Sequence, residues 1–420
     1  MTTSLHDEMM ALGDRAVAAA RQLATVETAQ KNAALQAMAK ALGIRAAAIL
    51  AANRQDLEAA RSAGVSRAML DRLALDERRL EAMARGLEAV AALPDPVGQT
   101  MAAWRRPNGL EIRKVRVPIG VIAIIYEARP NVTADAAALC VKSSNAVLLR
   151  GGREAAASNR AIAEALREGL RTAALPEDSI LFVDTPDREA VREIVQMVGR
   201  VDLVIPRGGE GLIQAVTEMA RVPVIKHYKG VCHVYVDAAA DLEMALAIAE
   251  NAKCQRPGVC NAMECLIVHR AVARHFLPRL AERLTTRGCR MKGDAEARAI
   301  VPSMEAATEE DWFTEYLDLV LNVRVVGSVE EAIAHIERYG SHHSDAIVTR
   351  DERAAEQFVR GVDSAAVYVN ASTRFTDGGE FGLGAEMGIS TDKIHARGPM
   401  GLEELTSYKY IVWGTGQIRT

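Results

Sequence analysis

Short apolar runs alternate with longer amphipathic segments between residues 118 and 369, and this alternation restricts the fold more than any other feature of the chain. Each run is apolar at successive positions, as in strands covered on both faces, and helical periodicity returns between most of them. Strands joined by crossover helices predict an α/β fold with parallel sheets. A first series of expected strands covers residues 119–125, 145–149, 180–183, 201–205 and 232–236. A second series covers residues 264–268, 321–326, 345–348 and 366–369. We therefore expect two Rossmann-like α/β domains with a cleft between them.

The segments that flank these series have other patterns. Residues 4 to about 94 show helical spacing of apolar side chains throughout. Asn108-Gly109 separates two short extended segments, which predicts a β-hairpin over residues 101–117. This hairpin packs either on its own chain or on another subunit. Residues 408–413 predict a last strand with no partner nearby in the sequence, and pairing with the hairpin of a neighbouring subunit is one interpretation of it.

Charge and cysteine content argue against several classes of protein. The formal net charge is −4 and no basic block stands out, so a general nucleic-acid-binding protein is not expected. No run of about 18 apolar residues is present, and the N-terminus lacks the basic start and apolar centre of a signal peptide. The six cysteines form neither a C-x-x-C pair nor a disulfide pattern. We expect a soluble cytoplasmic protein with reduced thiols and no membrane partner.

The segment 251–262 contains the most promising chemical group, the thiol of Cys260. Pro257 and Gly258 turn the chain just before it, between an amphipathic segment and an apolar run. Most buried thiols are inert, so a cysteine alone does not establish catalysis. As a nucleophile, Cys260 would hold a substrate as a thioester while a nicotinamide exchanges hydride. A zinc site is not expected, because the spacing of its candidate ligands fits no zinc motif. These candidates are Cys254, Cys260, Cys265 and His269.

Two loops are candidates for binding a dinucleotide, although no G-x-G-x-x-G motif follows the first strand. One loop follows the strand that ends at Leu149, and the other follows the strand that ends at Ile205. Both place glycines at the carboxyl end of a strand, where α/β proteins bind ligands, and arginine beside an adenosine ribose favours NADP over NAD. Two ordinary connecting loops remain the alternative. The candidate residues are Arg150, Gly151, Gly152, Arg153 and Ser158 in the first loop, and Gly208 and Gly209 in the second.

Asn131 directly follows Pro130, after the first buried strand and before a helical segment. Its side chain would cap that helix in one interpretation. In the other, its amide donates to an oxyanion together with the backbone N–H of Cys260. One side chain cannot easily do both.

Several strings of the sequence resemble those of one enzyme superfamily. Pro118-Ile-Gly-Val-Ile, the Pro-Asn pair and Asn145-Ala-Val-Leu-Leu-Arg-Gly-Gly are similar, in this order, to motifs of the aldehyde dehydrogenases. Other strings narrow the resemblance to the gamma-glutamyl phosphate reductase family, also called glutamate-5-semialdehyde dehydrogenases. These strings are Glu127-Ala-Arg-Pro-Asn-Val, Gly230-Val-Cys-His-Val-Tyr-Val-Asp, Gln255-Arg-Pro-Gly-Val-Cys-Asn-Ala and Asp377-Gly-Gly-Glu-Phe-Gly. The resemblance covers essentially the full length.

The resemblance implies a division of the chain into three parts. Residues 1–99 and 118–237, with part of 370–402, would form a nicotinamide-binding domain. Residues 238–369 would form the catalytic domain that carries Cys260. Residues 100–117 and 403–420 would form an oligomerisation element, so a homo-oligomer is expected.

The resemblance also implies roles for single residues. Cys260 matches the nucleophile, and Asn131 matches the residue that stabilises the oxyanion. Arg150 stands where many members have a cofactor-binding lysine. Glu315 is similar, more loosely, to the glutamate that holds the nicotinamide ribose, with an ordinary surface glutamate as the alternative. The candidate substrate-binding residues are Arg129, Arg256 and Asn261.

One departure from the superfamily pattern concerns the second half-reaction. Hydrolytic aldehyde dehydrogenases have a Glu-Leu-Gly-Gly segment whose glutamate activates water, and here the corresponding stretch reads His227-Tyr-Lys-Gly-Val-Cys. Without that base a thioester is attacked poorly by water, whereas phosphate is a competent nucleophile.

The resemblance therefore implies reduction of L-glutamyl 5-phosphate by NADPH to L-glutamate 5-semialdehyde and phosphate, in L-proline biosynthesis. The substrate would come from glutamate 5-kinase. The alternatives are a hydrolytic or CoA-acylating aldehyde dehydrogenase, or a catalytically silent scaffold. The presence of both Cys260 and Asn131 argues against the scaffold.

Overall fold

A computed structural model of the chain describes residues 4–226 and 228–419. The contacts between residues divide the chain into two compact units. The first unit comprises Met1–Lys226, Gly382–Gly388 and Met400–Thr420, and the second comprises His227–Phe381 and Ile389–Pro399. The last part of the chain therefore contributes to both units.

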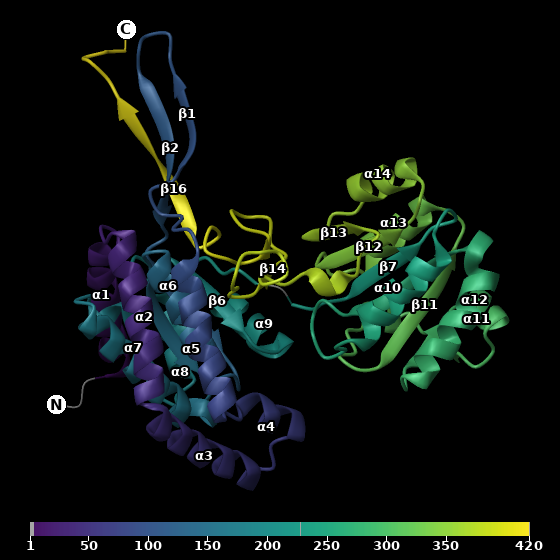
Figure 1. Ribbon diagram of the computed structural model, residues 1–420, viewed down its shortest axis with the longest axis horizontal. Coiled ribbons are helices and arrows are strands. Elements are labelled where there is room, and N and C mark those ends of the chain that lie inside the picture. Colours follow the sequence, from purple (N-terminus) through teal and green to yellow (C-terminus); the bar gives the residue numbers. More distant parts are fainter. Residues whose placement is uncertain (1–3, 227, 420) are drawn as a thin grey trace. The chain divides into compact units, whose positions relative to one another are not determined.

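The expected helical N-terminal region is confirmed. Its helices are α1 (Leu5–Leu23), α2 (Thr28–Ile44), α3 (Ala46–Ser62), α4 (Arg67–Leu73) and α5 (Glu77–Ala92). Helix α2 packs against α5 and α7, whereas α1 packs with α8 in another apolar cluster of the first unit (Figure 1). Among the described helices none is by itself long and apolar enough to cross a membrane, and only the bent pair α2–α3 passes that test together.

The first unit contains a four-stranded parallel sheet in the order β5-β4-β3-β6. Its strands are β3 (Val121–Tyr126), β4 (Ala146–Gly151), β5 (Ile180–Phe182) and β6 (Leu203–Arg207). The connecting segments are α6 (Asn131–Lys142), η1 (Arg153–Ala155), α7 (Ala156–Thr172), η2 (Glu177–Ser179), α8 (Glu189–Gln196) and α9 (Glu210–Met219). Because the chain runs from β3 to β5 on one side and returns to β6 on the other, the strand order reverses between β3 and β6. Ligands of open α/β sheets bind beyond the carboxyl ends of strands at such a reversal.

The second unit contains a seven-stranded parallel sheet in the order β10-β9-β11-β8-β7-β12-β13. The strands are β7 (Cys232–Val236), β8 (Met263–His269), β9 (Arg290–Gly293), β10 (Glu305–Ala306), β11 (Val320–Val326), β12 (Ser344–Val348) and β13 (Ala366–Val369). One face is covered by α10 (Leu242–Cys254), α11 (Arg270–Thr286) and α12 (Ala295–Ile300). The other is covered by α13 (Val329–Tyr339) and α14 (Glu352–Gly361), as Figure 1 shows. Two short 3₁₀ turns, η3 (Asp311–Phe313) and η4 (Thr373–Phe375), complete the unit.

The assignment of residues 232–236 to the first series of strands is wrong. Strand β7 pairs with β8 and β12 in the sheet of the second unit. The long N-terminal segment of the first unit therefore ends at Lys226 and not near residue 237. An apolar run predicts a buried strand, but its sheet depends on pairing with segments far away in the sequence.

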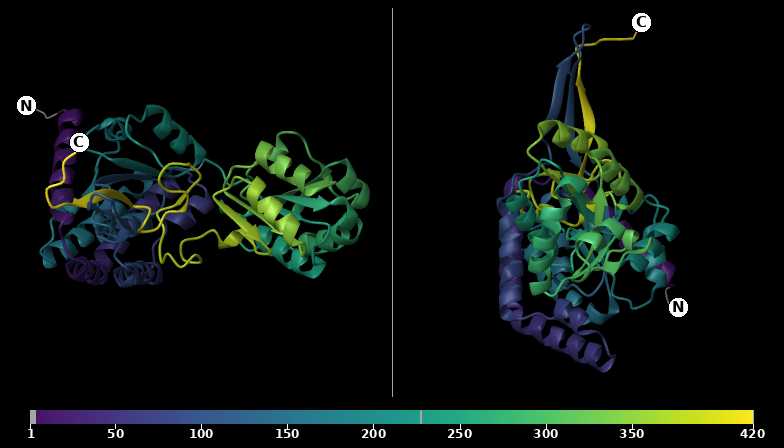
Figure 2. Two further views of the ribbon diagram at one scale, coloured as in Figure 1. Left: turned by 90° about the horizontal axis from the view of Figure 1, so that it is seen from above. Right: turned by 90° about the vertical axis from the view of Figure 1, so that its right-hand side faces the viewer.

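A three-stranded antiparallel sheet forms an arm of the first unit (Figures 1 and 2). The hairpin expected around Asn108-Gly109 is confirmed as β1 (Thr100–Arg105) and β2 (Glu111–Pro118). Strand β16 (Thr406–Trp413) pairs with β2 of the same chain along its whole length, so the interpretation in which this strand pairs with a neighbouring subunit is wrong. A small antiparallel pair, β14 (Ile389–Ser390) and β15 (Gly398–Pro399), belongs to the second unit.

Candidate active site

Cys260 lies in the loop that joins α10 to β8, the middle strand of the second sheet. Its side chain is half-buried. Burial raises the pKa of the thiols of Cys140, Cys232 and Cys265, so these three remain protonated and unreactive. Cys254 is also half-buried, and its hydrogen bond with Cys289 lowers its pKa. Exposure alone therefore does not distinguish Cys260 from Cys254. The further evidence for a nucleophile at Cys260 has to come from the structure of its loop.

The backbone of Cys260 is held in close contact with Gly230. A Cβ atom on Gly230 would lie 1.8 Å from the carbonyl oxygen of Cys260, so only glycine fits. The thiol of Cys232 donates to the same oxygen at 3.2 Å. The N–H of Gly230 donates to Oε1 of Glu315 at 2.9 Å. The structure thus brings Glu315 next to the loop of the candidate nucleophile.

The residue after Cys260 fastens the loop to the segment around η4. Asn261 is buried, and its amide donates to the carbonyls of Thr376 at 2.9 Å and Arg374 at 3.3 Å. The hydroxyl of Thr373 donates to the carbonyl of Asn261 at 2.8 Å. Because these bonds occupy the side chain, Asn261 positions the loop, and the structure does not support a direct contact between Asn261 and the substrate.

Arg374 is a site residue that the sequence analysis missed. Its guanidinium contacts the amide oxygen of Asn261 and donates to Oε1 of Gln255 at 2.8 Å, so it clasps the loop on both sides of Cys260. Burial lowers the pKa of Arg374, and the charge of Arg256 acts in the same direction. Arg256 itself is exposed. The signal that could have found Arg374 is a lone arginine in a polar loop, which is weak.

A buried ion pair joins the two elements that flank the loop. Lys253, in the last turn of α10, donates to Oε2 of Glu264 in β8 at 2.7 Å, and both side chains are fully buried. Burial raises the pKa of Glu264 to about 7, although the ammonium opposes the shift. The charge of Lys253 is therefore paired with Glu264.

In the first unit, the residues after β3 form a strained turn. Ala128 has a φ of 38°, which is uncommon for a residue other than glycine. Its N–H donates to Oε1 of Glu154 at 2.6 Å, which holds the turn. Asn131 is the first residue of α6, and Pro130 is its N-cap, so the expected capping by the Asn131 side chain is absent. The Asn131 amide is exposed and donates to Asp135 at 2.9 Å, and Arg129 is exposed beside it.

The loop after β4 is more enclosed than the sequence suggested. Arg150 is buried, and its guanidinium donates to the carbonyl of Gly151 at 2.6 Å and of Asp187 at 3.3 Å. A Cβ atom on Gly151 would lie 2.1 Å from the amide nitrogen of Asn159, so this glycine permits close packing. Gly152 is buried next to it, whereas Arg153 is exposed.

Ser158 belongs to a buried polar network and not to an open site. Its hydroxyl donates to the carboxylate of Asp56 at 2.6 Å, and its N–H donates to the same carboxylate at 2.7 Å. The amide of Asn53 donates to the Ser158 hydroxyl at 3.1 Å. The structure therefore gives Ser158 a role in joining α3 to α7, and we do not retain it as a cofactor-binding residue.

The loop after β6 already binds a carboxylate. Gly209 is the N-cap of α9, and its N–H donates to Oε2 of Glu127 at 2.9 Å. A Cβ atom on Gly208 would lie 2.4 Å from the same oxygen. Glu127 follows β3 and Gly209 follows β6, so this anion contact sits where the strand order reverses. A helix N-terminus at this place favours phosphate groups.

These features define a class of protein: two α/β units, an antiparallel arm, and a cysteine presented by a clamped loop. The sequence pattern of the aldehyde dehydrogenase family matches residues 4–319. The chain belongs to this family.

Within the family, named relatives identify the group more closely. The chain is 58% identical to gamma-glutamyl phosphate reductase of Moorella thermoacetica, over 98% of this chain and 99% of that protein. It is 54% identical to the protein of the same name from Heliobacterium modesticaldum, over 99% and 100%. The crystal structure of gamma-glutamyl phosphate reductase from Thermotoga maritima matches with a TM-score of 0.97 and 48% identity, covering 99% of this chain and 100% of that one. An acetylating aldehyde dehydrogenase from Geobacillus thermoglucosidasius, at 18% identity and a TM-score of 0.68, shares the fold.

Proposed function

We propose that the chain reduces L-glutamyl 5-phosphate to L-glutamate 5-semialdehyde and phosphate, with NADPH as hydride donor, in L-proline biosynthesis. The observation that carries this proposal is the clamped loop of Cys260, in a chain 58% identical to a named gamma-glutamyl phosphate reductase. Fixing both the carbonyl of Cys260 and the residue after it limits where the sulfur can lie. Such positioning is what a nucleophile needs to meet a carbonyl carbon at the correct distance.

The thiolate of Cys260 attacks the carbonyl carbon of the acyl phosphate, the C–O bond to phosphate breaks, and a thioester remains on the sulfur. Bound NADPH supplies the hydride that reduces this thioester. Release of the aldehyde then returns the sulfur of Cys260 as thiolate. The role proposed for Asn131 is to donate its exposed amide to the oxyanion, together with the backbone N–H of Cys260.

The contact made by Glu315 supports phosphate over water as the second substrate. The carboxylate of Glu315 accepts a hydrogen bond from the N–H of Gly230, so in this arrangement it is bound to the backbone. Residue 227, the first of the stretch that replaces the hydrolytic Glu-Leu-Gly-Gly segment, lies outside the described residues, and Tyr228 and Lys229 follow it without a carboxylate. A hydrolytic reaction needs a base that activates water.

The residues after β3 and β6 suit a dinucleotide. The N–H of Gly209 already donates to the carboxylate of Glu127, so pyrophosphate can take the place of that carboxylate. The exposed Arg153 is the cation available for a 2′-phosphate, and this favours NADPH. We retain Glu315 as a candidate for the nicotinamide ribose.

An Arg153→Ser variant is expected to raise the KM for NADPH at least about tenfold, since a charge-assisted contact is lost, and to leave the KM for NADH nearly unchanged. Equal effects on both cofactors would contradict this role.

The arm supports a homo-oligomer. It exposes several large apolar side chains, which are Trp104, Tyr408, Tyr410, Val412 and Trp413. Such a surface marks an interface. The other expected partner is glutamate 5-kinase, which would make the acyl phosphate. We place the reaction in the cytoplasm, where the Cys260 thiol stays reduced.

The test is the reverse reaction, reduction of NADP by glutamate 5-semialdehyde, followed with and without phosphate. Wild type is compared with Cys260→Ala and with Cys289→Ala, a control that removes a buried thiol outside the loop. We expect strict dependence on phosphate, and a loss of at least about a thousandfold in kcat for Cys260→Ala only. Full activity of Cys260→Ala would refute the thioester. Equal rates without phosphate would show a hydrolytic enzyme.

A further inference from the structure

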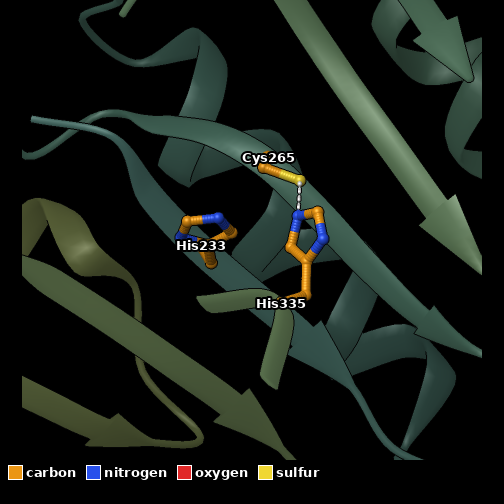
Figure 3. Close-up of side chains that lie close together, drawn as sticks. All are labelled: His233, Cys265 and His335. Carbon is orange, nitrogen blue, oxygen red and sulfur yellow. Dashed lines mark hydrogen bonds between the residues drawn. The ribbon is translucent and has the colours of Figure 1, made fainter. Parts of the chain in front are cut away.

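Three metal-binding side chains meet inside the second unit, on the face of the sheet that α13 covers (Figure 3). His233 in β7 and Cys265 in β8 are direct neighbours in the sheet register, so their side chains leave the same face. His335 comes from α13 above them. One ligand atom from each residue lies within 4.8 Å of the other two, and Sγ of Cys265 is 3.5 Å from Nε2 of His335. All three residues are buried.

A carboxylate behind His233 contacts one nitrogen of its ring. Oδ1 of Asp345 accepts the backbone N–H of His233 at 2.8 Å and lies 2.9 Å from Nδ1. Asp345 is in β12, and its other oxygen accepts the hydroxyl of Ser364. This contact occupies Nδ1, so Nε2 is the ring nitrogen of His233 that is left to bind a further group.

The other ring nitrogen of His233 is the unexplained feature. Within the described part of the chain, Nε2 of His233 is completely buried and has no hydrogen-bond partner, and the same is true of Nδ1 of His335. Leaving a buried polar atom unpaired is destabilising, because the atom loses its hydrogen bonds to water without a replacement. In Figure 3, Nε2 of His233 faces the side on which Cys265 and His335 meet.

We propose that Nε2 of His233, Sγ of Cys265 and Nε2 of His335 form a buried binding site for one Zn²⁺ ion. Two imidazoles and one thiolate are zinc ligands, and tetrahedral bonds of about 2.0 and 2.3 Å place nitrogen and sulfur about 3.5 Å apart. That is the separation of His335 and Cys265. The carboxylate of Asp345 behind a ligating histidine is the usual outer support of such a site. The thiolate and this carboxylate together balance the two positive charges.

Binding is an acid–base exchange with no redox step. Burial raises the pKa of Cys265 and lowers the pKa of His335 to about 2, so the metal-free chain holds a thiol and a neutral ring. The S–H bond breaks, a metal–sulfur bond forms, and one proton leaves to solvent. The rings of Trp312 and Tyr339 pack on His335 at centroid distances of 5.3 and 4.6 Å. Because these rings and the sheet enclose the site, the ion enters while the chain folds.

The ion would stabilise the second unit and take no part in the reaction. It would join β7, β8 and α13. Cys232 directly precedes His233 in β7, and its thiol donates to the carbonyl of Cys260. The site is therefore linked to the catalytic loop through the strands, while its ligands differ from the nucleophile.

The experiment uses the full chain with Cys260→Ala, so that the reactive thiol cannot bind the probe. The protein is refolded with Co²⁺, passed through gel filtration, and assayed for bound metal and for the near-ultraviolet thiolate-to-cobalt band. The same is done after adding Cys265→Ala, His335→Gln or, as a matched control, Cys289→Ala. X-ray absorption of the zinc-loaded protein, which needs no ligand variant, reports the coordinating atoms directly.

We expect one equivalent of cobalt with a thiolate band, displacement by Zn²⁺, and one sulfur and two nitrogen ligands. The Cys265→Ala and His335→Gln changes should weaken retention at least about tenfold, while Cys289→Ala retains the metal. Zinc should also raise the urea midpoint of unfolding in the protein that keeps all three ligands. Absence of a thiolate band, or an unchanged band in Cys265→Ala, would overturn the proposal. A zinc coordination shell without sulfur would overturn the assignment of the ligands.

Discussion

The Cα atom of Gly230 lies against the carbonyl oxygen of Cys260, so closely that a Cβ atom would stand 1.8 Å from that oxygen. Alanine at position 230 must therefore push the loop of Cys260, the proposed nucleophile, away. We expect Gly230→Ala to lower kcat at least about a hundredfold, because a displacement of about 1 Å has that effect on a reacting group.

The matched control for Gly230→Ala is Gly43→Ala, where nothing lies within 4 Å of the added carbon. Gly43 is in helix α2, so this change should leave kcat intact and stabilise the chain by up to about 1 kcal/mol. Steady-state kinetics and urea unfolding distinguish the two. Normal kcat in folded Gly230→Ala would show that the contact does not position Cys260.

The carboxylate of Glu127 occupies the N–H at the start of α9, where we propose that pyrophosphate binds. Glu127→Gln removes one negative charge from the place proposed for pyrophosphate. We expect the KM for NADPH to fall by about twofold to fivefold, since an anion at a helix N-terminus contributes about 0.3–1 kcal/mol. Glu218→Gln, at the other end of the same helix, is the control and should change nothing. A higher KM in Glu127→Gln would mean that the carboxylate shapes the loop and does not compete.

The ion pair of Lys31 and Asp95 holds α2 against the loop before the arm. Nζ of Lys31 lies 2.5 Å from Oδ2 of Asp95 and donates to the hydroxyl of Ser144 at 3.0 Å, and both charged side chains are buried. Lys31→Met should cost about 3–5 kcal/mol in the free energy of unfolding, because it leaves a buried carboxylate without its cation. Arg85→Ala breaks the exposed pair with Glu81 and should cost under about 0.5 kcal/mol. Urea denaturation measures both, and similar losses would contradict the prediction.

The carboxylate of Asp363 fastens residues 393–397 within the second unit. It contacts Lys393 and accepts from Nη1 of Arg397 at 2.7 Å, and these cations lower its pKa from 3.8 to about 2. Since the folded chain holds the proton more weakly, the pair stabilises the fold above pH 3.8, and this contribution is lost as the pH falls toward 2.

The Asp363 carboxylate is partly exposed, so solvent screening keeps its contribution below about 1 kcal/mol. Asp363→Asn should therefore be slightly less stable than wild type at neutral pH and equally stable near pH 2. Unfolding midpoints measured across this range provide the check. A difference that does not change with pH would rule out the ionic origin.

Local patterns in the sequence were sufficient for most of the secondary structure and for the choice of the Cys260 loop as the candidate site. The apolar runs predicted the main strands, and Asn108-Gly109 predicted the hairpin, because these signals depend on neighbouring residues. Short strands such as β9 and β10 carried no such signal. The motif around Cys260 pointed to the family, which the relatives confirm.

Pairing and burial were decided by the tertiary structure. The sheet that β7 joins and the strand that β16 pairs with depend on segments far apart in the chain. The same holds for Ser158, which looked like a loop residue and is enclosed by α3. Arg374 contacts Asn261 only because the segment after β13 folds back against the Cys260 loop.

The sequence by itself determined most of the elements, their order and the cysteine that we propose as the nucleophile, because each follows from residues close together in the chain. Only the tertiary structure decided what surrounds that cysteine: Gly230 against its carbonyl, Glu315 on Gly230, and Asn261 held by the segment around η4. It also brought His233, Cys265 and His335 together from three separate elements. The physical reason is that a strand or helix fixes only local geometry, whereas contacts across a sheet arise when distant segments pack to bury their apolar faces.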